Sequence, residues 1–129
     1  MASPNFTKYF ILFSFTSEHT IVGVLLQKDD QNFKKPIAYF SRTLRDSSLR
    51  YGIMEKQAYA LVKSLKESIT YILHSHVIAY VPSNSVKDIL THPEPEGRRG
   101  KWIAAMLKYD HKIKPTKLIK GQGLVNLMV

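Results

Sequence analysis

The chain has 129 residues, enough for one domain with a substantial hydrophobic core and too few for two. It contains no cysteine, which excludes disulfides and thiolate metal sites, and no apolar run long enough to span a membrane. Its 19 lysines and arginines against 10 aspartates and glutamates give a net charge of +9. This excess indicates a polyanionic partner such as nucleic acid. A basic surface that serves solubility, or a fragment whose other parts compensate the charge, would give the same excess.

The first third of the sequence predicts three strands joined by short turns. Residues 9–16 (YFILFSFT) form a dense apolar run typical of a central strand, and residues 20–27 follow after three polar positions, which indicates a hairpin. Residues 28–35 are predicted as a polar turn, and residues 36–41 as a third strand that begins with a proline. The three strands would form an antiparallel meander. Its aromatic side chains are expected in the core: Tyr9, Phe10, Phe13, Tyr39 and Phe40.

The hydrophobic period changes after the meander. Apolar residues recur at spacings of three and four over residues 53–73, which predicts one long amphipathic helix. The outer face of this helix carries Lys56, Lys63, Lys66 and Glu67. Residues 76–81 (HVIAYV) predict a fourth strand. Because a long helix separates it from the meander, this strand should run parallel to a meander strand through a crossover connection.

The last third of the sequence predicts two short helices and a fifth strand. Residues 84–90 are predicted as a helix, residues 92–100 as a loop rich in proline and glycine, and residues 101–109 as a second helix. The fifth strand should lie within residues 112–120. The predicted order of elements is therefore β-β-β-α-β-α-α-β in a mixed sheet.

Four segments of the sequence are distinctive: FILFSFTSEHTIVGVLLQ at 10–27, PIAYFSRTL at 36–44, YGIMEKQAYALVKSLK at 51–66 and GRRGKWIAAMLKYDHKI at 97–113. Each of them resembles part of the ribonuclease H domain of gypsy-type retrotransposon polyproteins. The family signatures P-I-A-Y-x-S-R-x-L and Y-x-x-x-E-K-E are the most specific parts of a resemblance that extends over about residues 10–127. The segment IKPTKLIKGQGL at 113–124 is most similar to plant members of the group.

The resemblance implies an α/β fold of the ribonuclease H-like type. This is a mixed five-stranded sheet, with three antiparallel strands followed by parallel crossovers, flanked by helices. The predicted order of elements agrees with that layout. We expect residues 1–129 to form a single domain with its core at about residues 8–120, and residues 121–129 to be a tail that resembles a truncated helix.

Ribonuclease H hydrolyses the RNA strand of RNA–DNA hybrids with two Mg²⁺ ions, which carboxylates from different elements hold. By the resemblance, the aspartate of T-D-A-S at the end of the first strand is replaced by Phe15. The second acid of E-K-E is replaced by Gln57, and the aspartate of Y-T-D-H after the fourth strand by Pro82. The fourth ligand falls in the terminal segment GLVNLMV, at Met128 or Asn126.

These replacements predict that no catalytic residue is retained, that no Mg²⁺ is bound and that the domain does not cleave RNA. Phenylalanine and proline side chains have no ligand atoms, and without the bridging carboxylate the two ions have no common anchor. A residual nuclease would need other acids to converge, and the candidates are Glu18, Glu55, Asp29 and Asp30. Their places in the sequence favour solvated surface acids instead.

Two groups of basic residues are candidates for contacts with nucleic-acid phosphates. The group that precedes the long helix comprises Arg42, Arg45 and Arg50. The second group comprises Arg98, Arg99 and Lys101, beside Trp102. An aromatic ring among cations is also typical of single-strand binding. For Trp102 we favour the interpretation as a core anchor of its helix.

The leading hypothesis is a connection- or tether-type domain of a retrotransposon reverse transcriptase that helps to hold an RNA–DNA hybrid. The resemblance implies a polymerase domain and a second ribonuclease H domain as partners in the same polyprotein. Two alternatives stay open: a residual metal-dependent nuclease, and a protein–protein interaction module or decayed element fragment. Because the sequence has no cysteine and no recognisable signal peptide, we expect it in the cytoplasm or nucleus and away from membranes.

Overall fold

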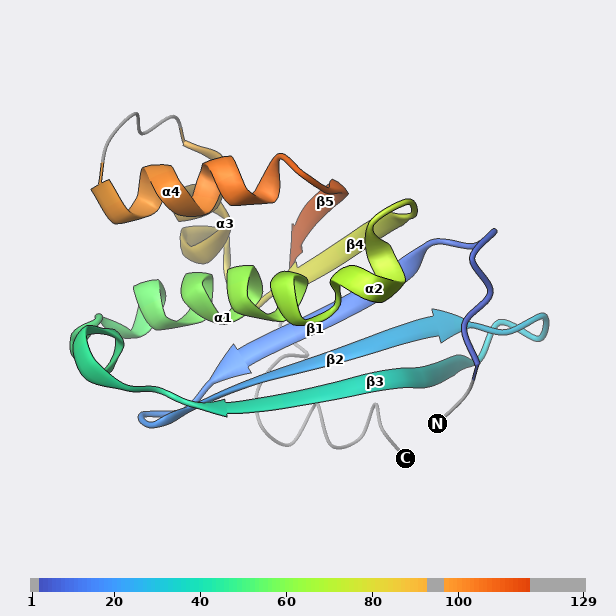
Figure 1. Ribbon diagram of the computed structural model, residues 1–129, viewed down its shortest axis with the longest axis horizontal. Coiled ribbons are helices and arrows are strands. Elements are labelled where there is room, and N and C mark those ends of the chain that lie inside the picture. The colour runs from blue at the N-terminus through green and yellow to red at the C-terminus, as the bar shows by residue number, and fades with distance from the viewer. Residues whose placement is uncertain (1–2, 93–96, 117–129) are drawn as a thin grey trace.

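Five strands form one mixed sheet in the order β3-β2-β1-β4-β5 (Figure 1). Their bounds are Phe10–Thr16 for β1, Thr20–Lys28 for β2, Lys34–Thr43 for β3, His76–Val81 for β4 and Asp110–Pro115 for β5. The pairs β1–β2 and β2–β3 are antiparallel, whereas β4 runs parallel to β1 and β5 runs parallel to β4. The computed structural model describes residues 3–92 and 97–116, and there the predicted meander and crossover are confirmed.

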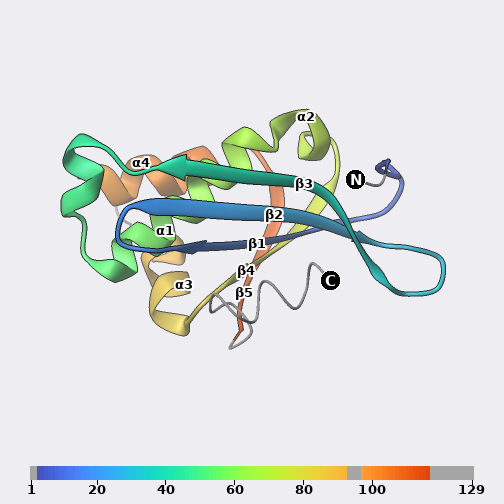
Figure 2. The ribbon, with the colours of Figure 1, turned by 90° about the horizontal axis from the view of Figure 1, so that it is seen from below.

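Four α-helices and one 3-10 helix complete the described part of the chain. They are the 3-10 helix η1 Asp46–Arg50, α1 Ile53–Glu67, α2 Ile69–Ile72, α3 Asn84–Thr91 and α4 Gly97–Met106. Helix α1 packs on β1 and β2, and α3 and α4 pack against α1 (Figures 1 and 2). Within the described ranges, no helix is both long and apolar enough to cross a membrane.

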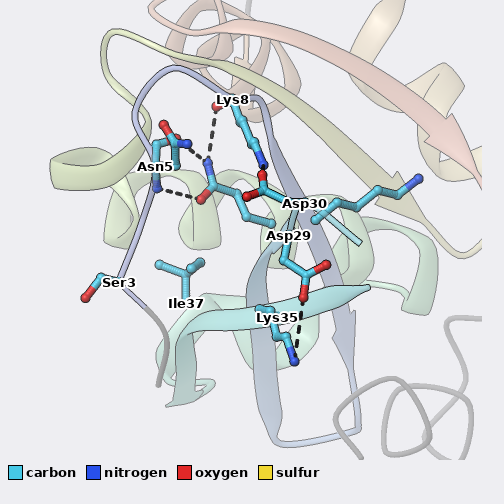
Figure 3. A pocket seen from close by; sticks show the side chains of 9 residues that line it. Ser3, Asn5, Lys8, Asp29, Asp30, Lys35 and Ile37 are labelled. Carbon is cyan, nitrogen blue, oxygen red and sulfur yellow. Dashed lines mark hydrogen bonds and ion pairs between the residues drawn. The ribbon is translucent and has the colours of Figure 1, made fainter. Parts of the chain in front are cut away.

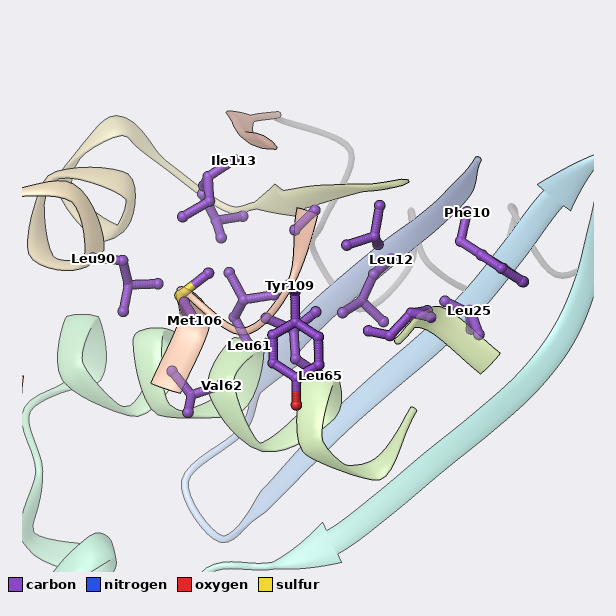
Figure 4. Packing of buried hydrophobic residues seen from close by; sticks show 14 of the residues in the cluster. Phe10, Leu12, Leu25, Leu61, Val62, Leu65, Leu90, Met106, Tyr109 and Ile113 are labelled. Atoms are coloured by element: carbon purple, nitrogen blue, oxygen red, sulfur yellow. The ribbon is translucent and has the colours of Figure 1, made fainter. Parts of the chain in front are cut away.

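The main core lies between α1 and the sheet. Side chains alternate between the two faces of a strand, so Phe10 and Leu12 of β1 both point toward α1. They join Leu61 and Leu65 of α1 in one buried cluster, to which Tyr109, just before β5, also belongs (Figure 4). Each fully buried side chain of this size contributes about 1.5–3 kcal/mol through the hydrophobic effect. This packing fixes α1 over the centre of the sheet.

The intervening residues of the same strands form a second apolar cluster on the other face of the sheet. Ile11, Phe13, Val24 and Leu26 are buried there. The ring of Phe13 stacks on that of Tyr80 from β4, with 5.0 Å between centroids. Apolar residues on both faces explain why β1 is a continuous apolar run rather than an alternating one.

The predicted single helix over residues 53–73 is wrong at Ser68, where the structure divides it into α1 and α2. The backbone of Ser68 has φ −91° and ψ 3°, outside the regular helical range. Its side-chain hydroxyl donates to the Ser64 carbonyl oxygen at 2.7 Å, and its backbone N–H is shared between the carbonyls of Ser64 and Leu65. A serine that bonds back to the preceding turn competes with regular helical hydrogen bonding, which accounts for the break.

Element boundaries near the C-terminal end also differ from the prediction. The loop predicted at 92–100 is wrong from Gly97 onward, where α4 already begins, and residues 93–96 lie outside the described residues. Contacts of Arg98 with Glu55 of α1 and with Tyr51 stabilise this first turn. Such contacts between distant segments cannot be predicted from the local proline and glycine content. The predicted helix over 101–109 ends at Met106, and β5 begins at Asp110 rather than within 112–120. The predicted tail at 121–129 lies outside the described residues.

The predicted aromatic core is correct in part. Phe10 and Phe13 are buried, whereas Tyr9 and Tyr39 are 40% and 50% exposed and Phe40 is only partly buried. Tyr39 lies on the edge strand β3, opposite Val24, where only one neighbouring strand covers it. The predicted turn at 28–35 is shorter than expected, because the pairing of β2 with β3 extends to Lys28 and Lys34.

Helix α1 approaches the sheet most closely at Gly23 of β2. A Cβ atom at this position would lie 2.8 Å from the Cβ of Ser64 and would also collide with its hydroxyl. Ser14, the partner of Gly23 in the β1–β2 register, is fully buried. Its hydroxyl has no hydrogen-bond partner among the described residues. The interface therefore tolerates no added side-chain volume at Gly23.

Gly23→Ala should destabilise the domain by about 1–3 kcal/mol, because the new methyl group forces α1 away from β2. The free energy of unfolding, measured by denaturant titration with circular dichroism, tests this expectation.

Ser14→Ala serves as the matched control on the neighbouring strand. It removes a buried hydroxyl that lacks a partner, so stability should stay the same or rise by about 1 kcal/mol. Equal destabilisation by both substitutions would contradict the close-packing explanation.

Candidate functional site

The strands β1, β3, β4 and β5 all end at one edge of the sheet, because only β2 runs in the opposite direction. Functional side chains in α/β sheets typically follow the carboxyl ends of such strands. The β1–β4 register pairs Phe13 with Tyr80. Phe15 lies two residues after Phe13, and Pro82 lies two residues after Tyr80. The two positions therefore follow the paired ends of β1 and β4 at this edge. That these two positions belong to one site stays a prediction from the sequence.

The start of α1 reaches the same edge. The Ser83 hydroxyl donates to the Met54 sulfur at 3.8 Å, which connects the first turn of α1 to the residue after Pro82. Gln57 lies one helical turn beyond Met54 and is half-buried. Positions 15, 57 and 82 thus lie around one end of the sheet.

The side chains at these positions offer little to a metal ion. Phe15 packs with Val22 and Tyr80 against the apolar cluster of the second face. Pro82 lines an open recess whose other residues are Ser83, Asn84, Pro115 and Thr116. Among the residues that the structure describes, no group of three His, Cys, Asp or Glu side chains could hold a metal ion. The fourth predicted position, Met128 or Asn126, lies outside the described residues.

Glu55, the acid closest to Gln57, is engaged elsewhere. Its carboxylate accepts hydrogen bonds from Arg98 and from Arg99 of α4, the latter at 3.1 Å. Partial burial would by itself raise the pKa of Glu55, but the hydrogen bonds and charges of the two arginines outweigh it and lower the pKa. Glu18, in the β1–β2 turn, is almost fully solvent-exposed. These two acids therefore do not converge.

The second basic group is integrated into the packing of α4 on α1. The guanidinium of Arg98 lies 4.1 Å from the ring centroid of Tyr51 and 5.8 Å from that of Trp102. Trp102 is 7% exposed and contacts the rings of Tyr51 and Tyr59, so its predicted role as a core anchor is confirmed. Arg98 and Arg99 thus have a structural role besides any contact with phosphates.

The first basic group lies at the edge where β3 ends. Arg42 forms a two-pronged ion pair with Glu67 of α1, with nitrogen–oxygen distances of 3.3 and 3.1 Å. Arg45 and Arg50 are exposed, as is Lys101 on α4, and within residues 3–92 and 97–116 these three side chains make no ion pair. Uncommitted cations are the ones best placed to bind an external anion.

A separate recess of about 220 Å³ lies at the opposite end of the sheet, where β2 ends (Figure 3). The buried Gln27 amide fastens the N-terminal segment there through hydrogen bonds with the backbone of Asn5 and Lys8. Asp29 and Asp30 are paired with Lys35 and Lys8. A hydrogen bond from Lys8 and its charge lower the pKa of Asp30. These acids stabilise the turn and lie far along the strands from positions 15 and 82.

Comparison with known proteins identifies the family. Residues 5–109 match the model of the RNase H-like domain found in reverse transcriptase. The chain belongs to this family.

Polyproteins of mobile elements are similar in sequence to the RNase H-like domain. The retrovirus-related Pol polyprotein from transposon opus of Drosophila melanogaster is 31% identical over 120 residues, which are 91% of this chain and 12% of the polyprotein. The transposon Tf2-3 polyprotein of Schizosaccharomyces pombe is 26% identical over 113 residues, which are 84% of this chain and 8% of that polyprotein. The domain therefore spans a small part of the curated relatives that it matches.

Solved structures confirm the predicted fold class. The foamy viral protease-reverse transcriptase in complex with dsDNA superposes with a TM-score of 0.69 at 19% identity, over 91% of this chain and 25% of that one. The same kind of enzyme in complex with RNA/DNA hybrid gives 0.65 at 21% identity, over 88% and 16%. RNase H1 from the archaeon Halobacterium salinarum gives 0.59 at 12% identity, over 84% of both chains.

Several side chains of the domain have roles that the sequence analysis missed. On the predicted outer face of α1, Glu67 binds Arg42, and the Lys56 ammonium donates to the Glu18 carbonyl oxygen at 2.8 Å. The ion pairs of Glu55 were also not expected. Helical periodicity separates apolar from polar faces, but it does not show which strand or helix lies beside a polar residue.

Glu55→Gln should make the domain less stable at pH 7 by about 1 kcal/mol, since the ion pair is partly exposed. A carboxylate with a lowered pKa stabilises the fold above about pH 4.5, and that contribution is lost as the pH falls through the lowered pKa. The difference between Glu55→Gln and the unmodified chain should therefore shrink at low pH. Thermal unfolding at several pH values measures it.

Glu18→Gln is the matched control, because the Glu18 carboxylate is exposed and, within the described ranges, its one ion contact is with His19 at 3.8 Å. This variant should unfold like the unmodified chain at every pH. A Glu55→Gln effect that stays the same from pH 7 to low pH would argue against the ion pair as its cause.

Proposed function

We propose that this chain is a catalytically inactive RNase H-like domain of a gypsy-type retrotransposon reverse transcriptase, which holds an RNA–DNA hybrid without cutting it. The observation that carries the proposal is the residue type at two positions that follow the paired ends of β1 and β4. Phe15 and Pro82 occupy the positions where the resemblance to ribonuclease H expects aspartates. Neither side chain has an atom that can bind a metal ion.

The chemistry of two-metal hydrolysis makes these replacements decisive. Mg²⁺ requires hard oxygen ligands, and a carboxylate that bridges both ions keeps them at the separation needed for attack and departure. Gln57 could supply one neutral amide oxygen, which is a weak ligand for Mg²⁺. Phe15, with its ring against an apolar cluster, occupies space that a metal ligand and its water would need.

Binding needs less than catalysis. A net charge of +9 and exposed cations at the edge where β3 ends favour contact with a phosphate backbone. The similar foamy viral enzymes were solved in complex with dsDNA and with RNA/DNA hybrid. Backbone contacts position a nucleic acid but do not read its sequence, so binding should be non-specific and sensitive to salt.

In this proposal the domain works as a tether within a larger polyprotein. The relatives are polyproteins of which this chain matches about a tenth, which supports neighbouring polymerase and second ribonuclease H domains as partners. The segment at 113–124 supports a plant element. The site of action would be the cytoplasm or the nucleus, and no Mg²⁺ cofactor would be required.

The domain should release no product from a labelled RNA–DNA hybrid with Mg²⁺ or Mn²⁺ beyond the metal-free background. The reason is the absence of carboxylates at positions 15, 57 and 82. Denaturing gel electrophoresis after long incubation checks this expectation.

Metal-dependent cleavage would instead support a nuclease with rearranged ligands. Glu18→Gln and Glu55→Gln provide the test of that alternative. Cleavage that either substitution abolishes would overturn the inactive assignment.

The domain should bind a labelled RNA–DNA hybrid with an affinity that falls steeply between about 50 and about 200 mM salt and is independent of sequence. Fluorescence anisotropy measures it. Arg50→Ala should weaken binding more than Arg98→Ala, because Arg50 makes no ion pair among the residues that the structure describes, whereas Arg98 is committed to Glu55. No binding even at the lowest salt would refute the nucleic-acid part of the proposal.

A further inference from the structure

An open recess of about 310 Å³ lies between the end of β3, the segment that leads into η1, and α1. We call it the β3–α1 recess. Its polar lining includes Ser48 together with Arg42, Thr43, Arg45, Asp46, Tyr59 and Lys63. The three cations come from three places in the chain: the end of a strand, the following segment, and the middle of a helix. Helix packing on the sheet, not sequence proximity, brings Lys63 to the two arginines.

The charges in the recess are not balanced internally. Arg42 is paired with Glu67, which holds its guanidinium in place. Arg45 and Lys63 make no ion pair within residues 3–92 and 97–116. Asp46, also in the lining, offsets only one of these two charges. Elsewhere in the described structure, Lys8 and Lys35 form ion pairs with Asp30 and Asp29. In the β3–α1 recess, by contrast, the positive charge exceeds the negative charge and is available to an external anion.

Neutral donors add to the cations. Burial, with a smaller contribution from Tyr51, raises the pKa of Tyr59, so its hydroxyl stays protonated and can donate. The Thr43 hydroxyl also lines the recess. Donors at fixed positions beside two cations suit a tetrahedral oxyanion.

The backbone beside Arg45 has an uncommon conformation. Asp46 has a φ of 53°, in the left-handed region that aspartate and asparagine adopt more readily than most residues. Asp46 is the first residue of η1, so this conformation lies where the chain enters that helix, directly after Arg45. The recess also lies at the edge of the sheet where β1 and β4 end, because β3 runs in the same direction as those strands.

We infer that the β3–α1 recess binds a phosphate group of the nucleic-acid backbone, through Arg45 and Lys63 with Arg42 held beside them. The inference rests on the proposed function in one respect, namely that the phosphate belongs to a nucleic acid. The affinity for a phosphate group is argued from the side chains of the recess alone. Lys63 and Tyr59 thereby become part of the nucleic-acid-binding surface. The recess would hold one phosphate of the nucleic-acid backbone at a defined position. Asp46 opposes the bound anion and limits its affinity.

The test uses the full chain and a labelled RNA–DNA hybrid in anisotropy titrations at several salt concentrations. The double variant Arg45→Ala/Lys63→Ala should bind about tenfold more weakly, and the slope of log affinity against log salt should fall by about 1. The matched control Lys108→Ala/Lys112→Ala removes the same charge from two exposed lysines outside the recess. It should change the affinity less than twofold.

Asp46→Asn should bind more tightly than the unmodified chain, since it removes a like charge and asparagine tolerates the same backbone conformation. A merely structural role of this segment would not produce tighter binding. Circular dichroism spectra and melting curves of all variants show whether each one is folded.

Inorganic phosphate supplies an arm that does not depend on the nucleic acid. In ¹H–¹⁵N NMR titrations, phosphate should shift the amide signals of Arg45, Asp46 and Lys63, and the double variant should lose these shifts. If the hybrid binds equally to the chain and to the folded double variant, the recess inference is overturned while the proposed function stands. If the hybrid does not bind but phosphate shifts these signals, the proposed function fails and free phosphate is the source. Absence of both responses overturns both.

Discussion

The close packing of α1 on β1 and β2 is the constraint on which the remaining features depend. It requires a glycine at position 23, since a side chain there would collide with Ser64. With α1 held at this distance, Leu61 and Leu65 fill the main core, and the polar residues of the helix are fixed relative to the strand ends. Gln57 is placed near Pro82 and Lys63 beside the end of β3 by the same contact.

The acids of this strongly basic chain are distributed so that several of them hold cations in place. On α1, Glu55 fastens α4 through Arg98 and Arg99, and Glu67 orients Arg42. These partly exposed ion pairs contribute little stability individually, but they decide which guanidinium groups are already committed. The number of basic residues therefore overstates the positive charge that is free to bind an external anion. Within the described residues, the case for such binding rests on the cations that make no ion pair, such as Arg45 and Lys63.

The side chains at positions 15 and 82 are compatible with the fold whether or not the domain is catalytic, and our proposal of an inactive domain depends on them. Carboxylates around a metal pair repel one another and are costly without the ions. Phenylalanine at position 15 packs against an apolar cluster that β1, β2 and β4 already form, so the replacement adds burial where the sheet can accept it. The sheet edge and the basic residues around it are still present, and the proposed binding depends on these parts.

The order of elements along the chain, the meander, the crossover and the apolar face of α1 could be predicted from the sequence, because apolar periodicity follows directly from strand and helix geometry. The substitutions at positions 15, 57 and 82 could also be read from the sequence, through its resemblance to ribonuclease H. The break at Ser68, the early start of α4 at Gly97 and the exposure of Tyr39 could not, because each depends on contacts or coverage between distant segments.

The sequence by itself determined the mixed α/β fold and the nature of the side chains at the expected catalytic positions, since both are local properties of pattern and residue type. Only the tertiary structure decided which charges remain available. Arg42, Arg45 and Arg98 are equivalent in a sequence, but α1 supplies a carboxylate to the first and the third and not to the second. The reason is that an ion pair requires two side chains at a few ångströms, and only the packing of α1 on the sheet and on α4 sets those distances.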